Sequence, residues 1–194
     1  IEKKFIQEYA KNKLSKLSVP LGGGGNYILL YFLIRKYKLI NIVETGVAAG
    51  WTSLAILRAL KKNGKGSLFS SDFPYFRLEN PEKYIGYLAK DESNTNNWFL
   101  DARGDDVALP EIVKRLENNS IDLFHYDSDK SYSGRANALK ILSSKINSKT
   151  IIIFDDIQNN LHFKDFVEKK RKDFFVCEFE GKYIGIIGLD DLKI

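Results

Sequence analysis

Short apolar runs rich in β-branched and aromatic residues recur along the chain and alternate with longer amphipathic stretches. The short runs predict strands at residues 40–43, 67–70, 98–100, 121–126 and 150–154. Apolar residues at helical spacing predict helices at residues 1–17, 27–39, 52–61, 110–116, 135–144 and 161–170. Two final apolar runs, at residues 174–179 and 183–189, flank Glu180-Gly181-Lys182 and predict a hairpin.

Strands that alternate with helices are typical of an α/β protein with a doubly wound, mostly parallel sheet, here ending in a C-terminal antiparallel hairpin. The 194 residues are enough for one such domain. We therefore expect residues 1–39, with two helices and a glycine-rich loop, to belong to the same domain as a ligand-binding and catalytic part at residues 40–194. Ligands of doubly wound sheets bind beyond the carboxyl ends of the strands, where candidate residues are therefore sought.

The composition narrows the class of protein without identifying a partner. A hydrophobic fraction of 44% with only 4 Pro is that of a folded globule, which excludes disordered and collagen-like chains. No run approaches the roughly 20 uncharged apolar residues of a membrane helix, so we expect no membrane partner. One cysteine, Cys177, and no apolar leader at the first residues favour a cytoplasmic protein. The net charge of +5 permits an anionic partner but does not require one.

Two glycine-bearing segments differ in what they predict. Residues Gly22 to Gly25 are four consecutive glycines without the Lys-Ser/Thr of a Walker phosphate loop, so we expect a hinge or lid. After the first strand, Gly46 and Gly50 allow a tight turn into a helix and a close approach of a ligand. Their spacing is not that of dinucleotide folds, and Glu44 at the strand end would repel a pyrophosphate, which favours a ligand such as S-adenosylmethionine over NAD.

Acidic residues follow the other strands as well. Asp72 ends the second strand, where doubly wound nucleotide folds keep an acid for the ribose hydroxyls. After the third strand, Asp105 or Asp106 could reach an adenine amino group. Taken singly, each of these acids could also be an ordinary turn residue.

The fourth and fifth strands end in Asp127-Ser128-Asp129-Lys130 and in Asp155-Asp156. We expect these ends to lie side by side, where the repulsion between carboxylates would be relieved by a divalent cation. Oxygen ligands suit Mg²⁺, Ca²⁺ or Mn²⁺ rather than Zn²⁺. The structural alternative is that Asp155 and Asp156 cap the next helix and that Asp127 and Asp129 only turn the chain.

These motifs, together with Glu44-Thr45-Gly46 and Thr150 to Asp156, resemble the class I S-adenosylmethionine-dependent methyltransferases. Within that superfamily the chain is most similar to bacterial metal-dependent small-molecule O-methyltransferases of the macrocin and mycinamicin type. The resemblance implies a Rossmann-like methyltransferase fold and an O-methyltransferase more than an N-methyltransferase. It also implies a cofactor site that contains Glu44, Gly46, Gly50, Ser53, Asp72, Asp105 and Asp106. The implied ligands of a divalent ion, with Mg²⁺ as first candidate, are Asp127, Asp155 and Asp156.

Lys130 departs from that family, because it replaces the histidine that serves as base there. Catechol O-methyltransferase is similar at this point, with a lysine three residues after its metal-binding aspartate. Lys130 can therefore still be a base, and Lys130 and Asp127 are the expected catalytic residues. The alternative is that Lys130 only forms an ion pair with Asp127 or Asp129.

Three further segments carry expectations. Residues 73–97, which include Phe73, Tyr75 and Phe76, are aromatic and polar and are the candidate cap over the acceptor, although aromatics at such spacing are more often local core. His125, inside the fourth strand, is expected to be a core histidine with satisfied hydrogen bonds. His162 is expected on a helix surface, with a second proton carrier as the alternative.

The expected partner is a small-molecule acceptor, and a homo-oligomer is compatible with the sequence. A nucleic-acid methyltransferase would share the cofactor loop, but Asp127-Ser128-Asp129-Lys130 lacks the two prolines of the motif that binds a flipped base. A non-catalytic module that binds S-adenosylmethionine is a second alternative, which the lysine at position 130 keeps open. A NAD-dependent reductase is a third, disfavoured by the glycine spacing.

Overall fold

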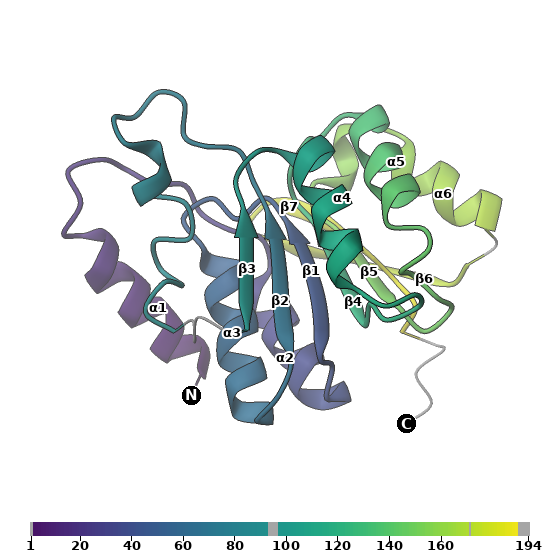
Figure 1. The fold of residues 1–194 in the computed structure, drawn as a ribbon, viewed down its shortest axis with the longest axis horizontal. Coiled ribbons are helices and arrows are strands. Elements are labelled where there is room, and N and C mark those ends of the chain that lie inside the picture. Colours follow the sequence, from purple (N-terminus) through teal and green to yellow (C-terminus); the bar gives the residue numbers. More distant parts are fainter. Residues whose placement is uncertain (1, 93–96, 171, 190–194) are drawn as a thin grey trace.

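The computed structural model describes residues 2–92, 97–170 and 172–189, and a seven-stranded sheet runs through the centre of this part (Figure 1). The strand order is β3-β2-β1-β4-β5-β7-β6, with β1 to β5 parallel and β7 antiparallel to both β5 and β6. The doubly wound α/β fold with its terminal hairpin is thereby confirmed. The strands are β1 (Asn41–Thr45), β2 (Ser67–Ser71), β3 (Trp98–Asp101), β4 (Leu123–Tyr126), β5 (Ile151–Phe154), β6 (Phe174–Phe179) and β7 (Lys182–Ile187).

Helices cover both faces of the sheet (Figure 1). One face packs against α1 (Glu2–Leu14), α2 (Tyr27–Tyr37) and α3 (Trp51–Asn63), and the other against α4 (Asp105–Arg115), α5 (Tyr132–Ile141) and α6 (His162–Lys170). Two short 3-10 helices, η1 (Pro81–Lys83) and η2 (Ile157–Asn159), lie in loops. The N-terminal helices α1 and α2 contribute Ile6, Leu30 and Ile34 to the same core as the sheet.

The near-continuous apolar sequence of β4 and β5 follows from this double cover. All four residues of each strand are buried, because successive side chains point to opposite faces and each face meets helices. In β4, Leu123 joins the core beneath α1 to α3, whereas Phe124 joins the core beneath α4 to α6. None of the described helices is both long and apolar enough to cross a membrane.

The predicted helix at residues 110–116 begins five residues earlier, so this prediction was wrong at its start. Gly104 is the N-cap of α4, and Asp105 and Asp106 occupy its first turn, where negative charge is favoured by the helix dipole. Proline is favoured in the first turn of a helix, but Pro110 lies inside α4. The helix extends past it because Leu109 and Ile112 are buried in the core. The true start matters because it places both acids at the edge of the sheet.

Candidate functional site

Strand register gathers polar side chains at one edge of the sheet. Glu44 in β1 is the register partner of His125 in β4, and both therefore point to the face covered by α1 to α3. Glu44, His125 and Ile153 are register partners in β1, β4 and β5. The residues two positions later, Gly46, Asp127 and Asp155, continue this row just past the ends of the strands. The expected side-by-side position of the acids after β4 and β5 thus follows from the register, which places Glu44 of β1 on the same face.

A cavity of about 380 Å³ opens at the carboxyl ends of β1, β2 and β4, a size within the usual range for small-molecule sites. Two glycines of the Gly22–Gly25 segment, Gly23 and Gly24, contribute to its wall together with Phe73. The segment expected to be a hinge or lid therefore lies over the strand ends. Five predicted site residues also line the cavity, namely Gly46, Asp72, Asp105, Asp106 and Asp127.

Three other predicted cofactor residues, Glu44, Gly50 and Ser53, are buried behind this wall. Oε2 of Glu44 accepts hydrogen bonds from the Ser53 hydroxyl at 2.6 Å and from the Ser70 hydroxyl at 3.0 Å. Oε1 of Glu44 has no hydrogen-bond partner among the described residues. Glu44 thus ties β1 to the start of α3 and keeps one buried acceptor unpaired.

The two glycines of the first loop are required by the close packing of backbone. Gly46 has φ +81°, and a Cβ there would collide with the carbonyl oxygen of Asp127. Gly50 has φ +90° at the N-cap of α3, and a Cβ would lie 2.9 Å from Cα of Gly86. Any side chain at either position would strain the backbone and push neighbouring segments away.

Asp72 holds the first loop in place from the end of β2. Its carboxylate accepts the backbone N–H of Ala48 at 2.6 Å and that of Phe73 at 2.7 Å. Burial raises the pKa of Asp72 to about 6, although both backbone hydrogen bonds oppose the shift. Ala48 has a left-handed backbone with φ 47°, which its bond to Asp72 helps to maintain.

Asp105 and Asp106 differ in their surroundings. Asp105 accepts hydrogen bonds from the hydroxyls of Ser71, at 2.6 Å, and of Ser128, and burial raises its pKa. Asp106 is exposed and accepts a hydrogen bond from the Asn137 side chain at 2.7 Å. The role of Ser128, which links the loop after β4 to Asp105, was not predicted from the sequence.

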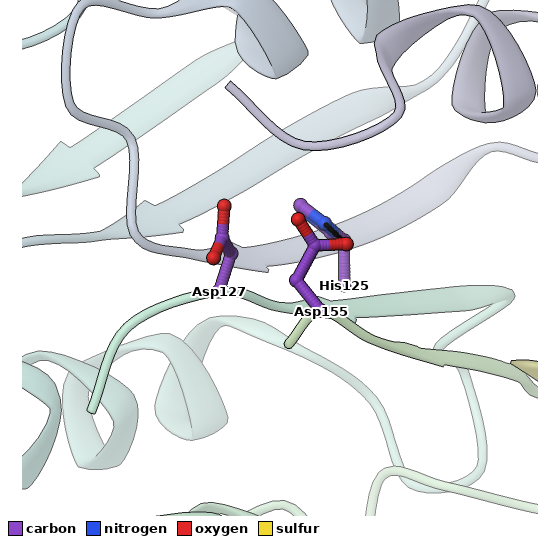
Figure 2. A group of neighbouring side chains, drawn as sticks. All are labelled: His125, Asp127 and Asp155. Carbon is purple, nitrogen blue, oxygen red and sulfur yellow. Dashed lines mark ion pairs between the residues drawn. The ribbon is translucent and has the colours of Figure 1, made fainter. Parts of the chain in front are cut away.

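His125, Asp127 and Asp155 form a compact group at the ends of β4 and β5 (Figure 2). Each offers one potential metal-ligand atom, and these atoms lie within 4.8 Å of one another. The side chains of His125 and Asp155 are only 1% and 0% exposed, yet Nε2 of His125 is 3.8 Å from Oδ1 of Asp155, too far for a hydrogen bond.

The expectation that His125 has satisfied hydrogen bonds was wrong. Within the described part of the chain, both ring nitrogens of His125 and both carboxylate oxygens of Asp155 are buried without a hydrogen-bond partner. Burial lowers the pKa of His125, but the negative charge of Asp155 and Asp127 outweighs it and leaves the pKa raised. Burial, followed by repulsion from Asp155, raises the pKa of Asp127.

Lys130 and Asp156 pair with each other beside this group. The Lys130 ammonium contacts the Asp127 carboxylate and lies 2.8 Å from Oδ2 of Asp156, which is also 3.7 Å from Nζ of Lys182. Burial lowers the pKa of Lys130, but these carboxylates outweigh it, so the pKa is raised. The alternative for Lys130 was an ion pair with Asp127 or Asp129, and the structure contains the pair with Asp127, whereas Asp129 accepts the backbone N–H of Ser131 at 2.9 Å.

Two further residues that hold the loops of the site were not predicted from the sequence. Arg135 in α5 is fully buried and donates from Nη2 to the carbonyl oxygens of Asp155, at 2.8 Å, and Asp156, at 2.9 Å. Asn160 donates to the carbonyl oxygen of Lys130 at 2.6 Å. Neither residue lies in a recognisable motif, because both act on backbone carbonyls far away in the sequence.

The aromatic segment at residues 73–97, the candidate cap over the acceptor, divides between the cavity and the core. Its residues 93–96 lie outside the described part of the chain. Phe73 is exposed, lies close to Gly104 and lines the cavity, and the ring of Phe76 is tilted against it with 5.9 Å between the ring centroids. Tyr87 and the adjoining Trp98 pack against the core instead. Among the described aromatic residues of this segment, Phe73 is the one that lines the cavity.

His162 lies away from this site, and its expected position on a helix surface was wrong. The ring is buried among Tyr132, Phe154 and Phe166. His162 lines a second cavity of about 640 Å³ between α5 and α6, whose lining shares no residue with that of the first. The larger cavity thus contains none of the predicted catalytic or binding residues.

Comparison with known proteins points to one family. A family model described as a methyltransferase domain matches residues 43–157. The structure is similar to an O-methyltransferase from Bacillus cereus in complex with S-adenosylhomocysteine, with TM-score 0.64, 15% identity, and coverage of 96% of this chain and 89% of that chain. A methyltransferase from Geobacter sulfurreducens has TM-score 0.62, 16% identity, and coverage of 96% and 87%, respectively. A Podospora anserina methyltransferase bound to S-adenosylhomocysteine has TM-score 0.62, 14% identity, and coverage of 93% and 86%. No curated protein sequence matches the chain.

The contact between the first loop and β4 can be tested with Gly46→Ala, for which Gly64→Ala is a matched control. Gly64 has φ +78°, close to that of Gly46, but a Cβ there meets no atom within 4 Å. The control should lose about 1 kcal/mol of unfolding free energy through backbone strain alone. Gly46→Ala should lose at least about 2 kcal/mol more, because its methyl group displaces the Asp127 carbonyl. Equal losses in urea titrations would contradict the contact.

Proposed function

The chain belongs to the methyltransferase domain family, and from this we propose that it transfers the methyl group of S-adenosylmethionine to a hydroxyl of a small-molecule acceptor with the help of a divalent cation. The observation that carries the proposal is the shared wall of the cavity. Gly46 and Asp72 line it at the ends of β1 and β2, and Asp127 lines it at the end of β4. A cofactor held at Gly46 and Asp72 would thus lie beside Asp127, where the acceptor would react.

The residues of the cavity fit this cofactor. Asp72 at the end of β2 offers carboxylate oxygens to the ribose hydroxyls, and Gly46 allows the backbone of the first loop to approach the ligand. Asp105, Asp106 and the exposed ring of Phe73 border the side where an adenine would lie. The excess of carboxylates along this wall favours a ligand with a sulfonium and an amino group over one with a pyrophosphate.

A divalent cation also fits the site. Asp127 and Asp155 are expected ligands, and the buried, unpartnered oxygens of Asp155 form an acceptor group that no described residue satisfies. Asp156, the third expected ligand, lies 2.8 Å from Lys130 and is not in the compact group. When bound, a divalent ion would supply charge that lowers the pKa of an acceptor hydroxyl.

The proposed reaction is an in-line displacement. The acceptor oxygen attacks the methyl carbon, the bond from carbon to the sulfonium breaks, and S-adenosylhomocysteine leaves. The hydroxyl proton must pass to a base, and Lys130 is placed for that role when its ammonium has lost its proton. Holding both reactants in the cavity contributes as well, because correct positioning can supply roughly 7–11 kcal/mol in ideal cases.

One observation favours a second candidate, a module that binds S-adenosylmethionine without turnover. Lys130 is paired with both Asp127 and Asp156, and its raised pKa keeps it protonated near neutral pH. A protonated lysine cannot accept the proton of a hydroxyl. Catalysis therefore requires that these carboxylates be neutralised by another charge, whereas simple binding of the cofactor does not.

Turnover and binding separate these two candidates. We expect the protein to bind S-adenosylhomocysteine in calorimetry and to transfer tritiated methyl groups to members of a panel of phenols and aliphatic alcohols with Mg²⁺ or Mn²⁺ present. Asp127→Asn should lower turnover by about 10²-fold or more while the affinity for S-adenosylhomocysteine stays within a few-fold. The control is Asp173→Asn, at an exposed residue. Tight binding without turnover on any acceptor would support the non-catalytic module, and no binding would refute both.

The ionisation of Asp72 predicts how cofactor affinity depends on pH. The pKa of about 6 in the free protein means that Asp72 loses its proton between pH 5 and 7, and only the carboxylate accepts both ribose hydroxyls. Affinity for S-adenosylhomocysteine should therefore fall by about tenfold from pH 7 to pH 5, with about fivefold of that loss between pH 6 and pH 5. Asp72→Asn should bind more weakly at pH 7 and lack this dependence. A wild-type affinity that is constant from pH 5 to 7 would argue against ribose binding at Asp72.

A further inference from the structure

His125 and Asp155 are a buried pair in the site to which the described residues provide no hydrogen bond. Their side chains are 1% and 0% exposed, and none of their four polar atoms has a hydrogen-bond partner in the described residues. Burying such groups without partners costs free energy for each group. A cation between them would satisfy an imidazole nitrogen and a carboxylate oxygen at the same time.

A third ligand stands beside this pair. Asp127 lies two residues after His125, on the same face of β4, and its carboxylate joins the other two within 4.8 Å (Figure 2). Asp127 also lines the cavity, whereas His125 and Asp155 do not. The buried pair would therefore form the inner side of a cation site, and the side facing Asp127 would be open towards the cavity.

The backbone of the glycine-rich segment packs directly against the pair. A Cβ on Gly25 would lie 2.5 Å from Oδ2 of Asp155 and 3.1 Å from Nε2 of His125. Only a glycine allows the chain to pass so close to both groups. The segment thereby contributes to the burial of both side chains.

From this arrangement we infer that His125, Asp127 and Asp155 form a mixed nitrogen and oxygen site for a divalent transition metal ion such as Mn²⁺, Fe²⁺ or Co²⁺, with preference over Mg²⁺. Imidazole is a ligand for transition metals, while Mg²⁺ is held mainly by oxygen. The expected third carboxylate, Asp156, lies outside this group and is paired with Lys130 and Lys182, whereas Asp127 belongs to the group although Lys130 also contacts it. The inference deepens the proposed function and rests on it for the use of the ion, but the composition of the site can be measured without cofactor or acceptor.

The two histidines of the chain make a direct test possible. Untagged, metal-free protein is titrated with Mn²⁺ and with Mg²⁺ by calorimetry, and bound Mn²⁺ is examined by electron spin-echo spectroscopy for coupling to an imidazole nitrogen. We expect Mn²⁺ to bind at least about tenfold more tightly than Mg²⁺ and to show nitrogen coupling. The coupling should disappear in His125→Asn, with Mn²⁺ affinity at least about tenfold lower. His162→Asn, whose ring lines the other cavity, is the matched control and should keep both properties.

Gly25→Ala is a second variant that leaves all three ligands in place. Its methyl group would press on Asp155 and His125, so Mn²⁺ affinity should fall although the nitrogen donor remains. Bound Mn²⁺ without nitrogen coupling, or unchanged affinity in a folded His125→Asn variant, would overturn the inference. So would the absence of Mn²⁺ binding, which would identify the pair as a buried ion pair. If Mg²⁺ supports methyl transfer and bound Mn²⁺ shows no nitrogen coupling, this metal site is refuted and the proposed function stays intact. If the metal site has this composition but the protein does not bind S-adenosylhomocysteine, the metal site is supported and the proposed function is refuted.

Discussion

The in-register pairing of the parallel strands β1, β4 and β5 is the constraint on which the site depends. Neighbouring residues in register share a face, so apolar partners such as Ile42 and Leu123 pack under α1 to α3 at one end of the strands. At the other end the same face carries Glu44, His125 and, two residues after His125, Asp127. A shift of β4 by one residue would turn His125 to the opposite face, towards α4 to α6. The apolar core therefore enforces the position of the polar groups.

Buried charge at this edge is only partly compensated by the protein itself. Lys130 neutralises Asp127 and Asp156, and Arg135 holds the backbone carbonyls after β5. Such pairing offsets the cost of removing charge from water. His125 and Asp155 face each other at 3.8 Å but have no hydrogen-bond partner among the described residues. Unpaired buried polar groups are rare in folded proteins and concentrate at sites where a ligand completes them. The same edge thus supports the fold with some of its groups and leaves others free for chemistry.

Most of the element order could be predicted from the sequence, because strands and helices here have distinct hydrophobic periods. β4 and β5 are apolar throughout, as strands covered on both faces are, and the acids directly after them mark where they end. The start of α4 could not be predicted from the same signal. Pro110 favours a helix start locally, but burial of Leu109 and Ile112 and the turn at Gly104 extend the helix by five residues. Local preference yielded to tertiary packing there.

The sequence by itself determined which residues lie at the carboxyl edge of the sheet, because the positions of Glu44, Asp72 and Asp127 follow from strand ends that are local features. It could not determine which charges meet. Asp155 and Asp156 are adjacent in the chain, yet Asp156 has a left-handed backbone with φ 53° and pairs with Lys130, while Asp155 faces His125. That division depends on backbone turns after the strands and on which segment covers each side chain. Both arise only when distant parts of the chain pack together.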